Sequence, residues 1–316
     1  MIIPTYFISC DWGTTNFRLR LVETNSLKVI AEHQTKQGVR RVYEKFLEQK
    51  ENTQAQFFSD YLKEQLKNFP LEHQNHHIVI AGMASANIGL KELSYASLPI
   101  NPQKNDLVWE SLVSENGLEI ILISGVKSSA GMMRGEEIQA VGLADLLAPH
   151  KNGILLLPGT HSKHITLKNN CFTALKTYMT GELFEVISKA SILKVSVSKN
   201  NWSPKRLQAF KKGIQLGIDG NLTANLFSIR ASHIIEKTKK KDNYYTLSGM
   251  LIGEELAYLQ KVNDIVFLAA SEPMMSMYEI ALEIILKPNQ LVKFNGSILE
   301  NAFLKGQKNI LLQHVK

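Results

Sequence analysis

Cysteine is scarce in this 316-residue chain, which contains only Cys10 and Cys171. Two cysteines cannot form a disulfide framework or a four-cysteine zinc site, and they fit a reducing compartment. Long apolar runs are also missing, because residues 120–123 and 154–157 fall far short of the ~20 residues of a membrane helix. The N-terminus lacks a basic segment followed by an apolar one, which argues against a signal peptide. We therefore expect a cytoplasmic protein.

A strong excess of one charge sign is absent as well. Lys and Arg number 36 against 29 Asp and Glu, which gives a formal net charge of +7. A positive field can attract nucleic acid, acidic membranes or small anions. The one dense basic run, residues 237–241, is interpreted as a solvated loop, because no nucleic-acid motif accompanies it. We expect no nucleic-acid or membrane partner.

The order of apolar segments predicts an α/β fold. The length suits two domains at ~100–200 residues each, and short apolar runs alternate with segments of helical spacing. Such alternation is typical of partly parallel, buried strands. Helices are expected at 42–67 and 134–147 and over most of the C-terminal half. Strands are expected at 6–10, 17–22, 28–33, 77–81, 119–123, 154–157, 164–167, 265–269 and 291–294.

A weak internal repeat connects the two halves of the chain. Residues 8–18 and 154–164 each contain an apolar strand, a Gly-Thr turn and a second strand, and both Gly-Thr pairs have the same offset of 146 residues (159 − 13). The repeat predicts two similar domains, each opening with a β-hairpin whose turn faces one shared cleft. A chance match of two ordinary hairpins is the alternative.

The two turns have the chemistry of a phosphate site. A Gly-Thr turn presents backbone N–H groups and a hydroxyl that no side chain blocks. Asp11 ends its strand, where a carboxylate could hold Mg²⁺ through water, whereas Leu157 occupies that place in the second copy. Ordinary turn chemistry explains Asp and Gly equally well. The candidate phosphate-binding residues are Gly13, Thr14, Thr15, Gly159, Thr160, His161 and Lys163.

Two adjacent glutamates between the turns are candidates for acid–base chemistry. Glu136 and Glu137 begin a predicted helix, where the helix dipole favours a negative charge, and this alone could explain them. The functional interpretation is a general base, ionised at pH 7, that accepts the proton of an attacking hydroxyl. We expect Glu136 to be that base. Glu137 would support the turn or pair with Arg134, which would orient the glutamates or a phosphate.

Eight short segments follow one another in the order found in a known enzyme family. The chain resembles the 2-dehydro-3-deoxygalactonokinases of the acetate and sugar kinase/Hsp70/actin superfamily over nearly its whole length. The segments are DWGTTN (11–16), GV with Arg41 (38–41), AGMASANIG (81–89), MRGEEIQ (133–139), LPGTHSK (157–163), TYMTGEL (177–183), RASH (230–233) and LSGMLIG (247–253).

The resemblance implies a fold and a domain division. It implies two similar actin-like, ribonuclease H-like domains, each a mixed sheet flanked by helices, around a central nucleotide and substrate cleft. The expected domains are residues 1–135, with the first phosphate hairpin and substrate loops, and 136–316, on the nucleotide side. The last helix is a candidate to return to the first domain.

The resemblance also implies a reaction and its ligands. The family uses ATP and Mg²⁺ to phosphorylate the 6-hydroxyl of 2-dehydro-3-deoxy-D-galactonate in D-galactonate catabolism. A kinase of a related 2-keto-3-deoxy sugar acid and a non-catalytic sugar-acid sensor are the alternatives. The sugar acid and ATP are the expected partners, and a homodimer is a further possibility. Candidate substrate residues, each with a plain surface, turn or capping role as its alternative, are Arg41, Gly82, Ser85, Asn87, Thr180 and Glu182.

One segment departs from the family pattern. Where the family carries an Ala-Gly-Thr-like turn near the adenosine, this chain has Ala269, Ala270 and Ser271. Replacing the glycine restricts the backbone and its close approach to a ligand. The change predicts altered nucleotide affinity or choice and is the one feature that favours the sensor.

Overall fold

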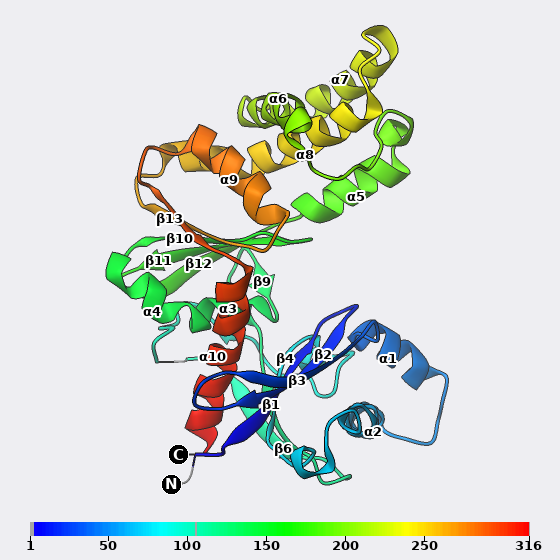
Figure 1. Cartoon of the computed structure of the whole chain (residues 1–316), viewed down its shortest axis with the longest axis vertical. Coiled ribbons are helices and arrows are strands. Elements are labelled where there is room, and N and C mark those ends of the chain that lie inside the picture. Colours follow the sequence, from blue (N-terminus) through cyan, green and yellow to red (C-terminus); the bar gives the residue numbers. More distant parts are fainter. Residues whose placement is uncertain (1–2, 105, 316) are drawn as a thin grey trace. The chain divides into compact units, whose positions relative to one another are not determined.

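The computed structural model in Figure 1 describes residues 3–104 and 106–315. The chain divides into two compact units. The first contains residues up to Lys151, Leu167–Leu175 and the chain from Ser297 onward, and the second contains Asn152–Thr166 and Lys176–Gly296. The first boundary therefore lies at residue 151, later than the expected 135. Within the described ranges, every helix is too short or too polar to cross a bilayer.

A six-stranded mixed sheet forms the centre of the first unit. Its order is β3-β2-β1-β4-β7-β6. Strands β1, β2 and β3 form an antiparallel meander, whereas β1, β4 and β7 run parallel. All five residues of β4 are buried, as expected for a central parallel strand. The strands are β1 (Tyr6–Trp12), β2 (Phe17–Glu23), β3 (Val29–Thr35), β4 (Ile78–Gly82), β6 (Trp109–Val113) and β7 (Glu119–Ile123).

Helices and a small second sheet complete the first unit. The C-terminal helix α10 packs on the large sheet, where Gln307 donates to the carbonyls of Cys10 in β1 and Val79 in β4 at 3.1 and 2.8 Å. The helices are α1 (Val39–Leu47), α2 (Gln54–Leu66), α3 (Glu136–Gly142), α4 (Ala144–Leu147) and α10 (Gly296–His314). The small sheet contains β5 (Ala96–Ser97), β8 (Val126–Lys127) and β9 (Met132–Met133).

The second unit repeats the strand order of the first. Its sheet runs β12-β11-β10-β13-β14, with β10, β13 and β14 parallel. This matches the β3-β2-β1-β4-β7 part of the first sheet, so the two Gly-Thr turns occupy equivalent places, each after the first strand of its sheet. The strands are β10 (Gly153–Leu157), β11 (Ser162–Lys168), β12 (Cys171–Tyr178), β13 (Ile265–Ala269) and β14 (Leu291–Phe294).

Five helices accompany the second sheet, and two of them touch through glycine. A Cβ on Gly213 or Gly217 of α6, or on Gly249 or Gly253 of α8, would lie 2.1–2.3 Å from a carbonyl oxygen of the facing helix. These four glycines let the two backbones meet and leave α8 little freedom to shift. The helices are α5 (Thr180–Ala190), α6 (Leu207–Ile218), α7 (Leu222–Ile235), α8 (Lys240–Leu256) and α9 (Met274–Ile285).

The mixed α/β fold with helix-flanked sheets is confirmed, but two expected helices are wrong in detail. The helix expected at 42–67 is α1 and α2, because a polar stretch separates them and Thr53 caps α2 by accepting the Gln56 N–H at 3.2 Å. The helix expected at 134–147 begins at Glu136 and is interrupted at Leu143. Strands β6 and β12 were not expected, because their exposed residues hide the apolar pattern.

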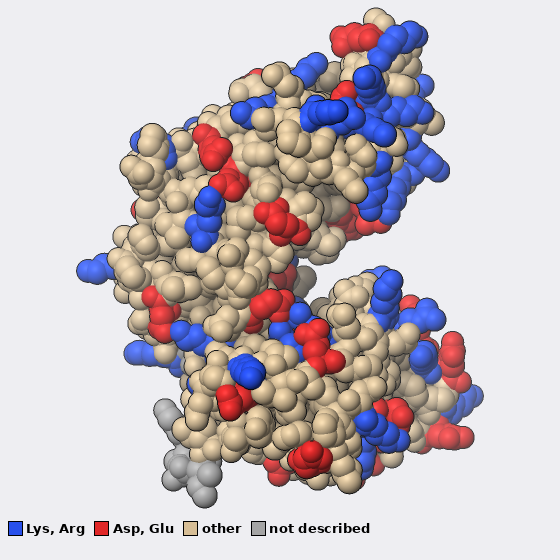
Figure 2. All heavy atoms as spheres, viewed as in Figure 1, with Lys and Arg blue, Asp and Glu red and all other residues tan. Residues whose placement is uncertain are grey.

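Positive charge gathers over part of the second unit. Figure 2 shows Lys and Arg side chains concentrated near α7 and the start of α8. Lys237, Lys239, Lys240 and Lys241 are all exposed there, and the last two begin α8. The run expected to form a solvated loop is therefore solvated, and it continues into a helix.

Candidate active site

The first Gly-Thr turn joins β1 to β2 and is held by the start of α1. The N–H groups of Gly38 and Val39 donate to the carbonyls of Thr15 and Gly13 at 3.1 and 2.9 Å. A Cβ on Gly38 would lie 2.4 Å from the Thr14 oxygen, so only glycine permits this approach. Within the described residues, the N–H groups of Thr14 and Thr15 make no backbone hydrogen bond. The turn thus presents donors suited to an anion.

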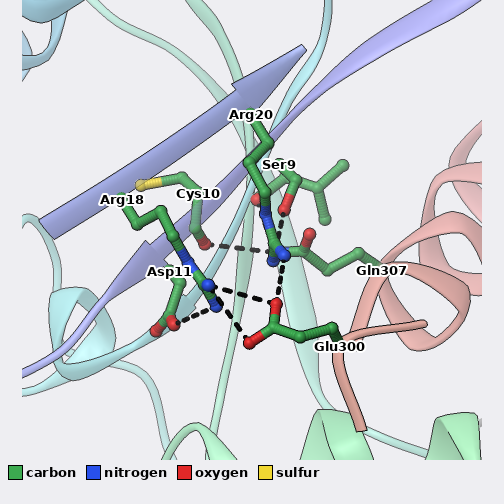
Figure 3. Close-up of polar contacts among 8 residues, drawn as sticks. Ser9, Cys10, Asp11, Arg18, Arg20, Glu300 and Gln307 are labelled. Carbon is green, nitrogen blue, oxygen red and sulfur yellow. Dashed lines mark hydrogen bonds and ion pairs between the residues drawn. The ribbon is translucent and has the colours of Figure 1, made fainter. Parts of the chain in front are cut away.

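Asp11 lies beside this turn in a cluster of charges, shown in Figure 3. Arg18 donates to the Asp11 carboxylate at 3.3 Å and to Glu300 of α10 at 3.1 Å, and Arg20 reaches the same Glu300 at 2.5 Å. Burial raises the pKa of Asp11, while the charges of Arg18 and Arg20 oppose that rise. The Asp11 side chain is still 35% exposed, so a hydrated cation can approach it. Sequence analysis placed no role on either arginine, yet Arg20 is buried within the cluster.

A polar cavity of about 540 Å³ opens next to Asp11. Two cations, Arg18 and Lys36, contribute to its lining and suit an anionic group. Lys36 was not a candidate in the sequence, because only the pairing of β2 with β3 brings the end of β3 beside the turn. The full lining is Asp11, Asn16, Phe17, Arg18, Gln34, Thr35 and Lys36.

The two adjacent glutamates differ in environment. The Glu137 carboxylate is fully buried and accepts the Gly135 N–H at 2.7 and 2.9 Å. Burial, together with the Glu136 charge, raises the pKa of Glu137 to about 8, so this residue is mostly protonated at pH 7. Glu137 was expected to support the turn or pair with Arg134, and its carboxylate contacts the turn at Gly135. Glu136 is partly exposed and accepts the backbone N–H of Arg134 at 3.2 Å.

The Arg134 side chain binds the loop that follows β4. Its guanidinium lies 4.2 Å from the Tyr95 ring centre and donates to the carbonyl and the hydroxyl of Ser85. Ser85 is fully buried, and its hydroxyl also donates to the Gly82 carbonyl at 3.3 Å. This differs from the expected sugar contact, because the Ser85 hydroxyl faces Arg134 and Gly82.

Three other substrate candidates lie at separate places in the first unit. Arg41 is exposed on α1, and Asn87 is exposed in the loop after β4. Gly82 is buried with φ of +103°, and a Cβ there would lie 2.6 Å from the Trp12 carbonyl oxygen. Close packing therefore explains Gly82 by itself. Substrate roles for these residues stay predictions.

The second Gly-Thr turn joins β10 to β11 and contacts the start of α5. The Glu182 N–H donates to the Thr160 carbonyl at 3.1 Å. A Cβ on Gly181 would lie 2.7 Å from the Gly159 carbonyl oxygen, whereas a Cβ on Gly159 would meet nothing within 4 Å. Open space thus lies against the backbone of Gly159, where a phosphate could approach.

Side chains surround the second turn. The His161 ring lies 2.5 Å from the Glu182 carboxylate, and both are partly exposed. The Lys163 ammonium donates to the His161 carbonyl at 2.7 Å, although the residue is only 4% exposed. Thr180 and Glu182, expected near the substrate, are therefore grouped with the second turn.

A cavity of about 570 Å³ opens beside the second turn. Its lining includes Gly159 and Thr160 of the turn and the rings of Trp202, Tyr244 and Tyr245. The sequence does not reveal this cavity, because its walls come from three helices, α5, α8 and α9, and from the loop before α6. The helical and loop residues that complete it are Thr180, Gly181, Phe184, Lys199, Asn200, Asn201, Ser248, Leu251, Ile252, Pro273, Met274, Met277 and Tyr278.

Comparison with known proteins identifies the family. A family model described as 2-keto-3-deoxy-galactonokinase matches residues 11–306. The chain belongs to this family. The 2-dehydro-3-deoxygalactonokinase of Escherichia coli (strain K12) is 29% identical over 259 residues, 80% of each chain. The "Probable 2-dehydro-3-deoxygalactonokinase DgoK1" of Rhizobium meliloti (strain 1021) is 29% identical over 293 residues, 90% of each chain.

A solved structure agrees with this assignment. A crystal structure of a Sinorhizobium meliloti protein, provisionally named 2-dehydro-3-deoxygalactonokinase, superposes with a TM-score of 0.78 at 27% identity. It covers 96% of this chain, which covers 98% of it. The resemblance found in the sequence motifs is confirmed, and the chain is a sugar-acid kinase by family. Kinase membership also implies the use of a nucleotide.

The segment that departs from the family pattern, residues 269–271, is not part of the cavity lining. Ala269 and Ala270 are almost fully buried, and the Ala270 N–H donates to the Phe294 carbonyl at 3.1 Å. Pro273 and Met274, a few residues later, line the cavity instead. The missing glycine therefore changes the end of a strand more directly than the surface a nucleotide would touch.

Proposed function

We propose that the chain phosphorylates the 6-hydroxyl of 2-dehydro-3-deoxy-D-galactonate with ATP, as a step of D-galactonate catabolism. The observation that carries the proposal is the cavity beside the second Gly-Thr turn. Its volume suits a nucleoside, and its aromatic walls suit a purine ring. A backbone turn with open space at Gly159 adjoins it and suits the phosphates.

The first unit supplies the remaining groups for phosphoryl transfer. Asp11 would hold Mg²⁺ through water, and the bound ion would neutralise charge on the phosphates. The donors of the first turn and the cations of Arg18 and Lys36 suit a phosphate or the sugar carboxylate.

Glu136 is the proposed general base. Its carboxylate would accept the proton of the 6-hydroxyl while the oxygen–phosphorus bond forms and the bond to ADP breaks. Glu136 suits this role better than Glu137. The Glu137 carboxylate is buried, accepts the Gly135 N–H and is mostly protonated near neutral pH. Arg134, two residues before Glu136, binds Ser85 in the loop that follows β4.

A coupled ADP-release assay over a panel of 2-keto-3-deoxy sugar acids and aldonic acids tests the proposal. We expect the highest kcat/KM with the galactonate-derived acid, and the product should carry phosphate on its 6-oxygen. A preference for the gluconate-derived epimer would make the chain a kinase of that related acid. Sugar-acid binding by calorimetry without ADP release would favour the sensor. A cytoplasmic location and a homodimer stay predictions.

A further inference from the structure

A buried carboxylate lies behind the second turn and plays no part in the reaction described above. Glu255, near the end of α8, is 2% exposed. Its Oε1 accepts from Nε2 of His164 at 2.8 Å, and its Oε2 accepts from the Tyr278 hydroxyl at 2.8 Å. The Thr180 hydroxyl also donates to Oε2. One carboxylate therefore receives three side-chain donors.

Each donor comes from a different element next to the proposed nucleotide site. His164 lies in β11, three residues after His161 of the turn. Thr180 begins α5, immediately before the Gly181 that packs on the turn backbone. Tyr278 lies in α9, and both Thr180 and Tyr278 line the cavity.

A second chain of hydrogen bonds leads from Glu255 to the turn itself. The Ser162 hydroxyl lies 3.1 Å from the Tyr278 hydroxyl, and its oxygen accepts the Gly159 N–H at 3.5 Å. Because Tyr278 donates to Glu255, Ser162 donates to Tyr278. The order Glu255, Tyr278, Ser162, Gly159 thus connects the carboxylate to the turn glycine.

Two tyrosines remain donors in this network. Nε2 of His164 lies 2.8 Å from the Glu255 carboxylate, and its Nδ1 lies 2.8 Å from the Tyr258 hydroxyl. Burial, followed by the Glu255 charge, raises the pKa of Tyr278. Burial, with Tyr178 and Glu255, also raises the pKa of Tyr258. Both tyrosines therefore remain protonated donors at neutral pH.

Burying the Glu255 carboxylate costs free energy, and an apolar side chain could fill the same space without that cost. A buried charge is unfavourable unless donors replace the lost water, and three donors do so here. The helix that carries Glu255 is itself fixed, because Gly249 and Gly253 place α8 in direct contact with α6. Glu255 therefore lies on a closely packed helix and binds three side chains from other elements.

We propose that Glu255 is a positioning residue for nucleotide binding: it holds the second Gly-Thr turn and the start of α5 in the geometry that receives the ATP phosphates. The proposal rests on the proposed function of that turn. Glu255 acts through Thr180, His164 and Tyr278. Its loss should therefore affect the nucleotide and leave the sugar acid little changed.

The test compares Glu255→Gln with Glu254→Gln, a matched change at the exposed neighbour on α8. Binding of a non-hydrolysable ATP analogue is measured by calorimetry, and KM is measured for ATP and for the sugar acid. For Glu255→Gln we expect Kd and the KM for ATP to rise about 10-fold or more, as for other residues that orient a ligand-binding group. The KM for the sugar acid should stay within about twofold in both variants.

A second pair keeps the test decisive if Glu255→Gln does not fold. His164→Gln retains an N–H donor toward Glu255, whereas His164→Leu removes it, and His164 does not line the cavity. We expect the glutamine variant to keep nucleotide affinity and the leucine variant to lose it. Rescue by glutamine would not be expected if His164 only filled space.

Failure of this proposal is distinct from failure of the proposed function. If the wild type binds the ATP analogue and folded Glu255→Gln binds it equally well with an unchanged KM for ATP, the positioning role is overturned. If His164→Leu binds the analogue as His164→Gln does, it is overturned as well. If the wild type itself binds no nucleotide, the proposed function fails, and this proposal fails with it.

Discussion

The start of a helix contacts each Gly-Thr turn through backbone groups, and buried side chains additionally hold the second turn. The start of α1 donates its N–H groups to the carbonyls of the first turn, and Gly38 packs directly on it. Around the second turn, Lys163 donates to the His161 carbonyl, and Ser162 and Tyr278 connect the turn to Glu255. Two turns that share a Gly-Thr pair thus differ in the neighbours that hold them.

The two units also differ in their acidic groups. Asp11 ends the strand before the first turn, and Leu157 takes its place before the second. Each unit buries one glutamate: Glu137 accepts a single backbone N–H, while Glu255 accepts three side-chain donors. Under the proposed function, the first unit would hold the metal and the general base, and the second would position the nucleotide.

The largest expected effect is at Glu136, in the first unit. Glu136→Gln cannot accept the hydroxyl proton, so we expect kcat to fall ~10²–10⁴-fold with little change in substrate affinity. Glu137→Gln should lower kcat much less, because Glu137 is buried and mostly protonated near neutral pH. Steady-state kinetics of both variants checks this. If kcat falls more in Glu137→Gln, Glu137 is the general base. If kcat falls only slightly in both variants, the base lies outside this segment.

Asp11→Asn tests the acidic group that the second turn lacks. The side chains are alike in size, so the fold should persist, while a neutral amide holds Mg²⁺ poorly. We expect activity at limiting Mg²⁺ to fall by about 10–100-fold, the range seen when a group that holds a metal through water is lost. A Mg²⁺ titration of kcat measures the effect. A Mg²⁺ dependence of kcat identical to that of the wild type would make Asp11 only a turn residue.

Two glycine substitutions compare how the turns are held. A methyl group on Gly38 would clash with backbone at 2.4 Å, and one on Gly181 with backbone at 2.7 Å. We expect both alanine variants to lose about 1–3 kcal/mol of stability, seen as a lower Tm. The KM for ATP should rise more in Gly181→Ala, because the start of α5 lines the cavity. An equal rise in both would remove the distinction between the turns.

The sequence supports the fold prediction where strands are short and apolar. Residues 119–123, 265–269 and 291–294 form strands with the expected bounds. Strand β12 was missed, because exposed residues interrupt its buried ones. The apolar pattern of a sequence predicts a strand well when buried residues occupy one face or both. It does not predict a strand in which each face contains both buried and exposed residues.

The candidate site was predictable only where a motif lies in one segment. The turns and the adjacent glutamates could be found in this way. The contact of Arg134 with Ser85 joins residues 49 positions apart, and that of His164 with Glu255 joins residues 91 apart. Such contacts depend on tertiary packing, so neither the buried state of Ser85 nor the role of Glu255 could be read from spacing.

The smallest expected effect is a pH dependence of stability at Glu137. Burial raises the pKa of Glu137 in the folded state to about 8, from an ordinary value of 4.5. Between these values the folded protein keeps a proton that the unfolded chain has released. The contribution of Glu137 to stability is therefore complete below about pH 4.5, declines as pH rises and is lost once pH passes about 8.

Glu137→Gln removes this titration and keeps a neutral side chain of the same shape. We expect the Tm of the variant to gain a few degrees on that of the wild type as pH rises from about 5 to 8. Above about pH 8 the difference should stay constant. Thermal unfolding of both proteins across this range, with exposed Glu254→Gln as the control, measures it. A difference that is flat with pH would mean that Glu137 is ionised in the folded protein, and it would then compete with Glu136 for the role of base.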